Sequence, residues 1–425
     1  MSELSYIETL CHRVKHAEGD TAALHSSHKN KVLLHLAELL DERRANIIAA
    51  NKLDLDNATK ANLPESFIER LTLDGKRITT MIEGLHGVAA LADPIGEVIG
   101  GNVLDNGLKI VKRRVPIGTI GIIYESRPNV TVDSFALCLK SGNCAVLRGG
   151  KEAINTNKKL MELIRRALMF GEANPNSAAL VEDTSREAAA EFMRQNAYID
   201  ALIPRGGKGL IDAVVRNSTV PVIQTGAGNC HLYVDESAEL DMAIKIADNA
   251  KRQRPSVCNS IETLLVHEKI APLFLPRIAE LWNTPPVMTL YADEVSTKII
   301  RDFAFINAAR DVTDDDFYKE YNNYEIAIKV VEDFEEAVAH INKYGTKHSE
   351  CIVTSNMRNA ERFQDRVDAA AVYVNASTRF TDGFQFGMGA EIGISNQKLH
   401  ARGPLGLTEL TTYKYLISGD GQVRI

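Results

Sequence analysis

The sequence predicts an α/β protein with two doubly wound parallel-sheet domains. Short apolar segments alternate with helical segments from residue 117 to about 225, and the same alternation starts again near Asn229. Apolar strands joined by crossover helices are typical of a parallel sheet that is covered on both faces. A chain of 425 residues is also too long for one comfortable core, which favours two or three domains.

Ahead of this alternation the chain is expected to be helical and then to form a hairpin. Leu and Ile recur at helical spacing in residues 31–51, which favours helices from residue 1 to about 95. Residues 97–115 alternate with period two around an Asp-Asn-Gly turn at 105–107, and this pattern predicts a β-hairpin. So small a hairpin has little core of its own. It is expected to be either an arm that pairs with another subunit or an ordinary surface hairpin.

The strands and domains are expected as follows. The strands of the two sheets are placed at 117–125, 143–149, 176–183, 198–204 and 220–225, then at 231–236, 261–267, 325–331, 350–355 and 370–377. We place a nucleotide cofactor-binding domain at 1–228, with the arm at about 97–115, and a second domain carrying Cys258 at 229–400. The C-terminal segment 401–425 is expected to return to the first domain and to pair as a strand with the arm.

The composition excludes several functional classes. The net charge is −7 and the pI is near 5.9, so nothing favours a nucleic-acid partner. The six cysteines lack paired spacing, which argues against a disulfide framework, and no histidine spacing predicts a metal site. The N-terminus lacks the apolar core of a signal peptide, and no apolar run approaches the ~20 residues that span a membrane. We therefore expect a cytoplasmic protein without metal, nucleic-acid or membrane partners.

Cys258 is the candidate nucleophile. It follows Lys251, Arg252, Arg254 and Pro255 in a loop between an expected helix and an expected strand. Nearby cations favour the thiolate, which is the reactive form of the side chain. A free cysteine is also among the most often buried residues and usually packs as a small hydrophobe, so both interpretations are open from these residues alone.

Two glycine pairs follow expected strands and carry cations. They are Arg148–Glu152, with sequence RGGKE, and Pro204–Leu210, with sequence PRGGKGL. Backbone amides at such turns suit phosphate groups. Neither segment matches GxGxxG or the phosphate-binding loop pattern, and glycines at strand ends are often plain turn residues.

Other polar residues have weaker signals. Arg127 and Asn129 lie in a loop after the first long strand, where Asn129 could either donate to a developing oxyanion or cap the helix expected near Thr131. His348 and His400 are isolated and are expected to be structural or on the surface. The Gly-rich and aromatic segments near residues 378–407 either close over a ligand or pack between domains.

Four long segments together resemble one known family. They are YESRPNVTVDSFAL at 124–137, KRQRPSVCNSIETLLVH at 251–267, YVNASTRFTDG at 373–383 and KLHARGPLGLTELTTYKY at 398–415. The chain resembles the aldehyde dehydrogenase superfamily from about residue 5 to the C-terminus, and within it the members that reduce an acyl phosphate. The resemblance implies an aldehyde dehydrogenase-like fold whose hairpin is an oligomerisation arm.

The resemblance also implies a reaction. NADPH would reduce L-glutamyl 5-phosphate to L-glutamate 5-semialdehyde in proline biosynthesis, with release of phosphate. Cys258 would attack the acyl phosphate and form a thioester, and Asn129 would supply the oxyanion hole. Hydrolytic members of the superfamily have a general-base glutamate where this chain has Gln224. A glutamine cannot deprotonate water, which suits an enzyme that must avoid hydrolysis.

By the same resemblance, binding residues can be assigned. Where NAD-specific members often place a glutamate this chain has Lys151, which together with Arg148 would attract the 2′-phosphate of NADP(H). Arg127 and Arg402 would face the charged groups of the substrate. The cofactor-binding residues expected in full are Arg148, Gly149, Lys151, Pro204, Arg205, Gly206, Gly207 and Gly226.

The expected partners and the competing functions complete the interpretation. The arm and the C-terminal strand favour a homo-oligomer, and the instability of an acyl phosphate would make association with the upstream glutamate kinase useful. A hydrolytic aldehyde dehydrogenase is the nearest alternative. Two further alternatives are a cysteine amidohydrolase or transferase without a nicotinamide cofactor, and a catalytically silent nucleotide-binding scaffold.

Overall fold

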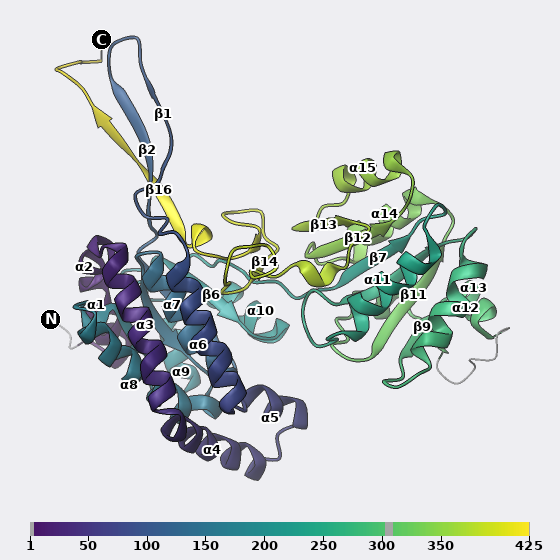
Figure 1. Ribbon diagram of the computed structural model, residues 1–425, viewed down its shortest axis with the longest axis horizontal. Coiled ribbons are helices and arrows are strands. Elements are labelled where there is room, and N and C mark those ends of the chain that lie inside the picture. The colour runs from purple at the N-terminus through teal and green to yellow at the C-terminus, as the bar shows by residue number, and fades with distance from the viewer. Residues whose placement is uncertain (1–3, 302–308, 425) are drawn as a thin grey trace. The chain divides into compact units, whose positions relative to one another are not determined.

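The computed structural model describes residues 4–301 and 309–424, which form two compact units (Figure 1). Unit 1 comprises the chain up to Thr225, Gly387–Gly393 and the chain from Leu405 onwards. Unit 2 comprises Gly226–Phe386 and Ile394–Pro404. Each unit has its own parallel sheet, which confirms the α/β class with two doubly wound sheets.

The division of the chain differs in detail from the expected bounds of 228/229 and 401. The chain leaves unit 1 after Thr225, whose hydroxyl donates to the carbonyl of Pro204 at 2.6 Å. It returns at 387–393, where the Leu405 N–H donates to the Gly393 carbonyl at 2.7 Å. Between these points a short hairpin of β14 (Ile394–Ser395) and β15 (Gly403–Pro404) belongs to unit 2. These crossings depend on pairing between distant segments, which leaves no periodic signal in the sequence.

The N-terminal region is helical, as its periodicity predicts. The helices are α1 (Tyr6–His16), α2 (Glu18–Ala23), α3 (Ser26–Glu42), α4 (Arg44–Lys60), α5 (Glu65–Leu71) and α6 (Gly75–Ala90). Ser5 and Asp74 accept main-chain N–H bonds at the starts of α1 and α6, which satisfies donors that a helix leaves unpaired. In the part of the chain that the structure describes, no helix combines the length and the apolar character that a membrane crossing requires.

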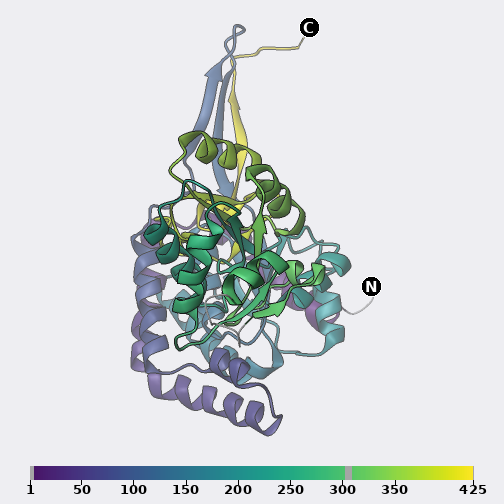
Figure 2. The same ribbon diagram turned by 90° about the vertical axis from the view of Figure 1, so that its right-hand side faces the viewer.

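The predicted hairpin is present and has a third strand. β1 (Val98–Val103) and β2 (Lys109–Pro116) pair antiparallel across a turn in which Gly107 has a φ of 85°. β16 (Thr411–Ser418) pairs with the other edge of β2, as the sequence predicted for the C-terminal segment. The three strands run side by side as an extended ribbon in both side views (Figures 1 and 2).

The sheet of unit 1 has the order β5-β4-β3-β6 and is parallel throughout. Its strands are β3 (Thr119–Tyr124), β4 (Cys144–Arg148), β5 (Ala178–Leu180) and β6 (Ala201–Arg205). α1, α9 (Arg186–Phe192) and α10 (Lys208–Asn217) share one apolar cluster with the sheet, while α7 (Asn129–Lys140) and α8 (Ile154–Phe170) contact β4 and β5. The strand expected at 220–225 is reduced to a bridge between Leu202 and Val222, because Pro221 has no N–H to continue a ladder.

The sheet of unit 2 has the order β10-β9-β11-β8-β7-β12-β13, with parallel pairing throughout. Its strands are β7 (Cys230–Val234), β8 (Ile261–His267), β9 (Thr289–Ala292), β10 (Ala309–Asp311), β11 (Glu325–Val331), β12 (Ser349–Val353) and β13 (Ala371–Val374). The sequence interpretation missed β9, β10 and the helix α13 (Glu294–Arg301) between them. Both strands are too short to show a repeating apolar pattern.

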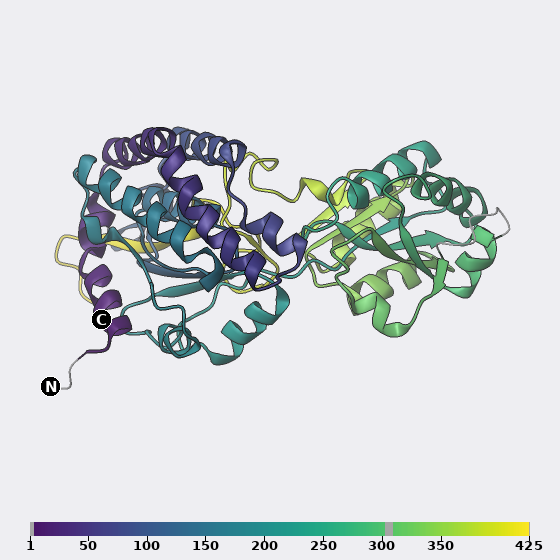
Figure 3. The ribbon, with the colours of Figure 1, turned by 90° about the horizontal axis from the view of Figure 1, so that it is seen from below.

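Helices cover both faces of this second sheet (Figure 3). α11 (Leu240–Arg252), α12 (Ala271–Trp282) and α13 pack into the larger apolar cluster. α14 (Phe334–Tyr344) and α15 (Met357–Arg366) pack into the cluster on the opposite face. The nearly continuous apolar character of β8 and β11 follows from this coverage, because both faces of each strand are buried.

A buried ion pair joins α11 to β8. Lys251 Nζ lies 2.5 Å from Glu262 Oε2, and both side chains are fully buried. Burial lowers the pKa of Lys251 and raises the pKa of Glu262 to about 8, although each charge favours ionisation of the other. Each buried charge therefore depends on the other for its ion pair.

Removing one partner should expose this dependence. We expect Lys251→Met to destabilise unit 2 by about 3–5 kcal/mol, because the Glu262 carboxyl is left buried without its partner. The double variant Lys251→Met/Glu262→Leu should recover most of the loss. Urea unfolding of the full chain measures both, with the exposed Lys245→Met on the same helix as control. If the single and double variants were equally destabilised, the loss would not come from the unpaired Glu262 carboxyl.

Candidate active site

Cys258 lies in the loop between α11 and β8, at the amino-terminal edge of the unit 2 sheet. It is partly exposed, whereas the other five cysteines are buried. Burial raises the pKa of the Cys11, Cys144 and Cys351 thiols to about 12, and it raises the pKa of Cys230 well above its usual range. The chain thus has one thiol in an accessible setting, and the buried alternative considered for Cys258 does not apply.

The three cations before Cys258 do not act together, contrary to the interpretation from the sequence. Lys251 points into the core and is paired with Glu262. Arg252 donates to the Leu281 carbonyl at 2.9 Å and lies 3.3 Å from Asp248. Arg254 is exposed. These residues are close to Cys258 in the sequence. In the structure, however, the side chains of Lys251 and Arg252 on α11 bind other groups of the chain.

The main chain at Cys258 is held by tight packing. The Cys230 thiol donates to the Cys258 carbonyl at 3.2 Å. A Cβ on Gly228 would lie 1.4 Å from that same carbonyl oxygen, so only glycine fits at residue 228. The Gly228 N–H donates to Glu320 Oε1 at 2.8 Å. The sequence interpretation did not single out Glu320, because nothing in its surroundings marks it.

The chain after β13 turns back towards this loop. The Cys351 thiol donates to the Ala376 carbonyl at 3.1 Å, and the hydroxyls of Ser349 and Thr381 lie 2.7 Å apart. These bonds bring the 3-10 helix Thr378–Phe380 beside Asn259, the residue after Cys258. The Thr378 hydroxyl donates to the Asn259 carbonyl at 2.6 Å.

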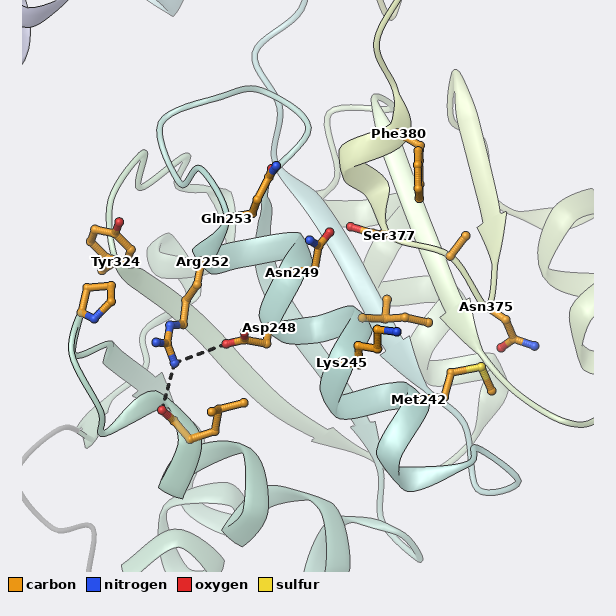
Figure 4. Close-up of a pocket in the computed structure, with 14 residues that line it drawn as sticks. Met242, Lys245, Asp248, Asn249, Arg252, Gln253, Tyr324, Asn375, Ser377 and Phe380 are labelled. Atoms are coloured by element: carbon orange, nitrogen blue, oxygen red, sulfur yellow. Dashed lines mark hydrogen bonds and ion pairs between the residues drawn. The ribbon is translucent and has the colours of Figure 1, made fainter. Parts of the chain in front are cut away.

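A pocket of about 930 Å³ runs along α11 beside the same segments (Figure 4). Lys245 and Asn249 line it from the helix, Gln253 from the residue after the helix, and Ser377 and Phe380 from the segment after β13. The pocket mixes apolar, amide and charged side chains. Gln253 is the first residue of the Cys258 loop, and its Oε1 accepts a bond from Arg379 Nε, in the segment after β13, at 2.7 Å.

Gly226 and Arg402, which the sequence predicts to bind cofactor and substrate, both contact other residues of unit 2. Gly226 packs against Asn396, whose amide a Cβ would meet at 2.1 Å, so its small size serves packing. Arg402 lies 3.0 Å from Asp368, which also pairs with Lys347 and Lys398. Bonds from these cations, Lys347 foremost, hold the pKa of Asp368 well below its usual range. This ion pair leaves less of the Arg402 charge for a substrate.

In unit 1 the predicted cofactor residues gather at the carboxyl edge of the sheet. Ile123 of β3 pairs with Arg148 of β4, and Tyr124 pairs with Arg205 of β6. The segments after these three strands therefore begin side by side. This edge includes the point where the strand order reverses around β3, which is where open α/β sheets bind ligands.

The β6 end of this edge differs from the expectation. Pro204 and Arg205 are the last residues of the strand itself. The Gly207 N–H, at the start of α10, donates to Glu125 Oε2 at 2.9 Å. A Cβ on Gly206 would meet that carboxylate at 2.7 Å. The Gly207 amide, which the sequence predicts to bind phosphate, is thus bonded to the Glu125 carboxylate. Glu125 is 82 residues away in the sequence, so this contact could not be predicted from spacing.

The β4 end fits an anionic ligand better. Gly149 is close to Asn157 and Tyr124, and a Cβ there would meet Asn157 Nδ2 at 2.2 Å. Lys151 is exposed and begins the 3-10 helix Lys151–Ala153. Arg148 instead donates to the carbonyls of Thr184 and Ser185, at 3.2 and 2.9 Å, and burial lowers its pKa. Lys151 is therefore the exposed cation at the β4 end, as Lys208 is at the β6 end.

Asn129 is the first residue of α7, not a loop residue ahead of it. The helix starts two residues before the expected Thr131, with Pro128 at its N-cap. Asn129 Nδ2 donates to Asp133 Oδ2 at 2.8 Å, one turn further along. Burial raises the pKa of Asp133 to about 6, against the opposing effects of Asn129 and Arg205. Arg127 is half-buried in the preceding loop.

The predicted residues thus fall into two groups, one in each unit. Unit 1 brings together the carboxyl edge of its sheet with Asn129 at the start of α7, and unit 2 holds Cys258 in a rigid loop. Within the ranges 4–301 and 309–424, no group of three or more metal-ligating side chains is found.

Comparisons with known proteins show the family to which the chain belongs. A model of the aldehyde dehydrogenase family matches residues 5–297 and 326–414. A gamma-glutamyl phosphate reductase of Carboxydothermus hydrogenoformans is 55% identical over 98% of each chain. One of Clostridium beijerinckii is 52% identical over 96% of this chain and 97% of its own.

A solved structure extends the likeness to the fold. The crystal structure of a gamma-glutamyl phosphate reductase from Thermotoga maritima superimposes with a TM-score of 0.95 at 49% identity, over 99% of this chain and 100% of that one. The family match covers most of the chain, and the relatives match it nearly end to end. The chain therefore belongs to the aldehyde dehydrogenase family and, within it, to the gamma-glutamyl phosphate reductases.

Proposed function

We propose that the chain catalyses the NADPH-dependent reduction of L-glutamyl 5-phosphate to L-glutamate 5-semialdehyde and phosphate, a step of proline biosynthesis. The observation that carries this proposal is the single accessible thiol, Cys258, in a loop held rigidly by its neighbours. The chain also has Gln224 where hydrolytic relatives have a base. The relatives named above support the choice of substrate.

The chain's residues would perform the first half of the reaction. The Cys258 thiolate attacks the acyl carbon, the bond from that carbon to the phosphate oxygen breaks, and phosphate leaves with the electron pair. The product is a thioester on Cys258. Asn129 has a second amide hydrogen beyond the one donated to Asp133, and we assign it to the developing oxyanion. Such a donor contributes about 3 kcal/mol to the transition state.

The second half needs a nicotinamide cofactor, which supplies the hydride that releases the aldehyde when it is bound. We assign the cofactor to the carboxyl edge of the unit 1 sheet, at the β4 end. Lys151 is exposed there, next to the turn that Gly149 and Gly150 form after β4. A cation at this position favours the 2′-phosphate of NADP(H) over the free hydroxyl of NAD(H).

The first experiment tests the reaction itself. NADPH formation is followed with glutamate 5-semialdehyde and NADP, with and without phosphate. We expect strict dependence on phosphate, because the thioester must be released by phosphate in this direction. Reduction of NADP without phosphate would assign the protein to hydrolysis instead, and no reduction under either condition would exclude a dehydrogenase.

The two catalytic assignments predict different losses. Cys258→Ser should abolish turnover, because a hydroxyl is a far weaker nucleophile, while leaving NADP(H) affinity and folding unchanged. Asn129→Ala should lower kcat about 100-fold, the loss typical of one oxyanion donor. Steady-state kinetics measure both, and far-ultraviolet circular dichroism checks folding. Turnover by Cys258→Ser would refute the thioester, and an unchanged kcat in Asn129→Ala would refute the oxyanion role.

The cofactor preference predicts a selective effect at Lys151. Lys151→Glu should raise KM for NADPH by at least about tenfold and change KM for NADH much less, since only NADPH carries a phosphate at the 2′ position of the adenosine ribose. The exposed Lys60→Glu in the same unit is the matched charge reversal. Equal weakening of both cofactors would mean that the 2′-phosphate binds elsewhere.

Association with other chains completes the proposal. We assign self-association to the ribbon of β1, β2 and β16, which exposes Val98, Val103, Tyr415 and Ile417. Light scattering of the full chain tests this assignment, and a monomer at micromolar concentration would refute it. Association with a glutamate kinase would protect an unstable acyl phosphate, and co-sedimentation of the two proteins tests it.

A further inference from the structure

Arg379 lies at the junction between α11, the Cys258 loop and the segment after β13. Its Nε donates to Gln253 Oε1 at 2.7 Å, one residue beyond the end of α11. Its Nη1 donates to Asn259 Oδ1, on the residue that follows Cys258. One guanidinium thus connects both ends of the loop that carries the nucleophile.

Asn259 is fixed from three directions by the same segment. Besides accepting from Arg379, it donates through Nδ2 to the Thr381 carbonyl at 2.9 Å. Its own carbonyl accepts from Thr378 at 2.6 Å. The side chain of Asn259 is buried, so losing one of these bonds would leave a polar atom without water to replace it.

The electrostatic surroundings of Arg379 include the nucleophile. Burial lowers the pKa of Arg379 and the charge of Arg254 lowers it further, while Cys258, Asp382 and Cys230 raise it. The Cys230 thiol is buried and has a strongly raised pKa, so it is neutral. Cys258 is thus among the groups whose charge acts on Arg379, and hydrogen bonds fix Arg379 to both ends of the loop that carries Cys258.

We propose that Arg379 is a positioning residue for Cys258, which holds the nucleophile loop through Gln253 and Asn259 and stabilises the thiolate by its charge. This inference rests on the proposed role of Cys258 as nucleophile. The two functions require different features of arginine. Bonding to Gln253 and Asn259 together needs the planar guanidinium, whereas stabilising the thiolate needs only a positive charge.

Two variants separate the functions. Arg379→Gln removes the charge, and Arg379→Lys keeps the charge but cannot span Gln253 and Asn259 together. Alkylation of the full chain by iodoacetamide, measured against pH without substrate, reports the thiolate at the accessible cysteine. We expect alkylation of Arg379→Gln to be about tenfold slower at pH 7 and its profile to move to higher pH, the tenfold corresponding to one unit.

The charge-conserving variant should behave differently. Arg379→Lys should keep the alkylation profile close to that of the unaltered chain but lower kcat at least about tenfold, because the loop loses its tether. Arg366→Gln on α15 removes an exposed arginine of the same unit and is the matched control. Cys258→Ser confirms that the alkylated residue is Cys258.

Two results would overturn the proposal. One is an alkylation profile of Arg379→Gln that matches the unaltered chain, and the other is full turnover by Arg379→Lys. If Arg379→Gln does not fold, Gln253→Ala removes one tether only and should lower kcat while the alkylation profile stays in place. The alkylation needs neither substrate nor cofactor, so a failure of the proposed reaction would be seen separately in the phosphate-dependent assay.

Discussion

The main-chain contact between Gly228 and Cys258 constrains unit 2, the half of this protein that carries Cys258. The strand β7 begins just after Gly228, and β8 begins just after the Cys258 loop, so the two segments meet at one edge of the sheet. Because residue 228 has no Cβ, the Cys258 carbonyl can lie close to the main chain there. The same carbonyl accepts a hydrogen bond from the Cys230 thiol. Glu320 and Arg379 then tie the two sides of this contact to the rest of unit 2. These contacts give the Cys258 loop a defined position, which a catalytic nucleophile requires.

The role of a charged side chain in this protein depends more on its partner in the structure than on its position in the sequence. Lys251, Arg148 and Arg402 all belong to segments that suggest anion binding, yet each is committed to a group of the chain itself. Burial makes such pairing necessary, because an unpaired charge in the interior is strongly destabilising. The cations left towards solvent, such as Lys151 and Arg254, are the ones that can meet a ligand.

The predicted site residues lie at opposite edges of the two sheets. In unit 1 they lie at the carboxyl edge, where the segments after β3, β4 and β6 start side by side, and in unit 2 Cys258 lies at the amino-terminal edge. In unit 2 the segment after β13 folds back along β12 and supplies the partners of Asn259. A single helix-strand crossover could not bring these residues together, which explains why they come from segments more than a hundred residues apart.

The sequence by itself determined the fold class, the hairpin with its third strand, and Cys258 as the candidate nucleophile. These features follow from local periodicity, turn chemistry and residue type, which act over short distances along the chain. The tertiary structure alone decided which glycine amide bonds to Glu125, where Lys251 points, and that Arg379 bonds to Gln253 and Asn259. It also decided the strands β9 and β10 and the repeated crossings near residues 387–405. Such features depend on contacts between distant segments, and short segments without periodicity carry no signal of them.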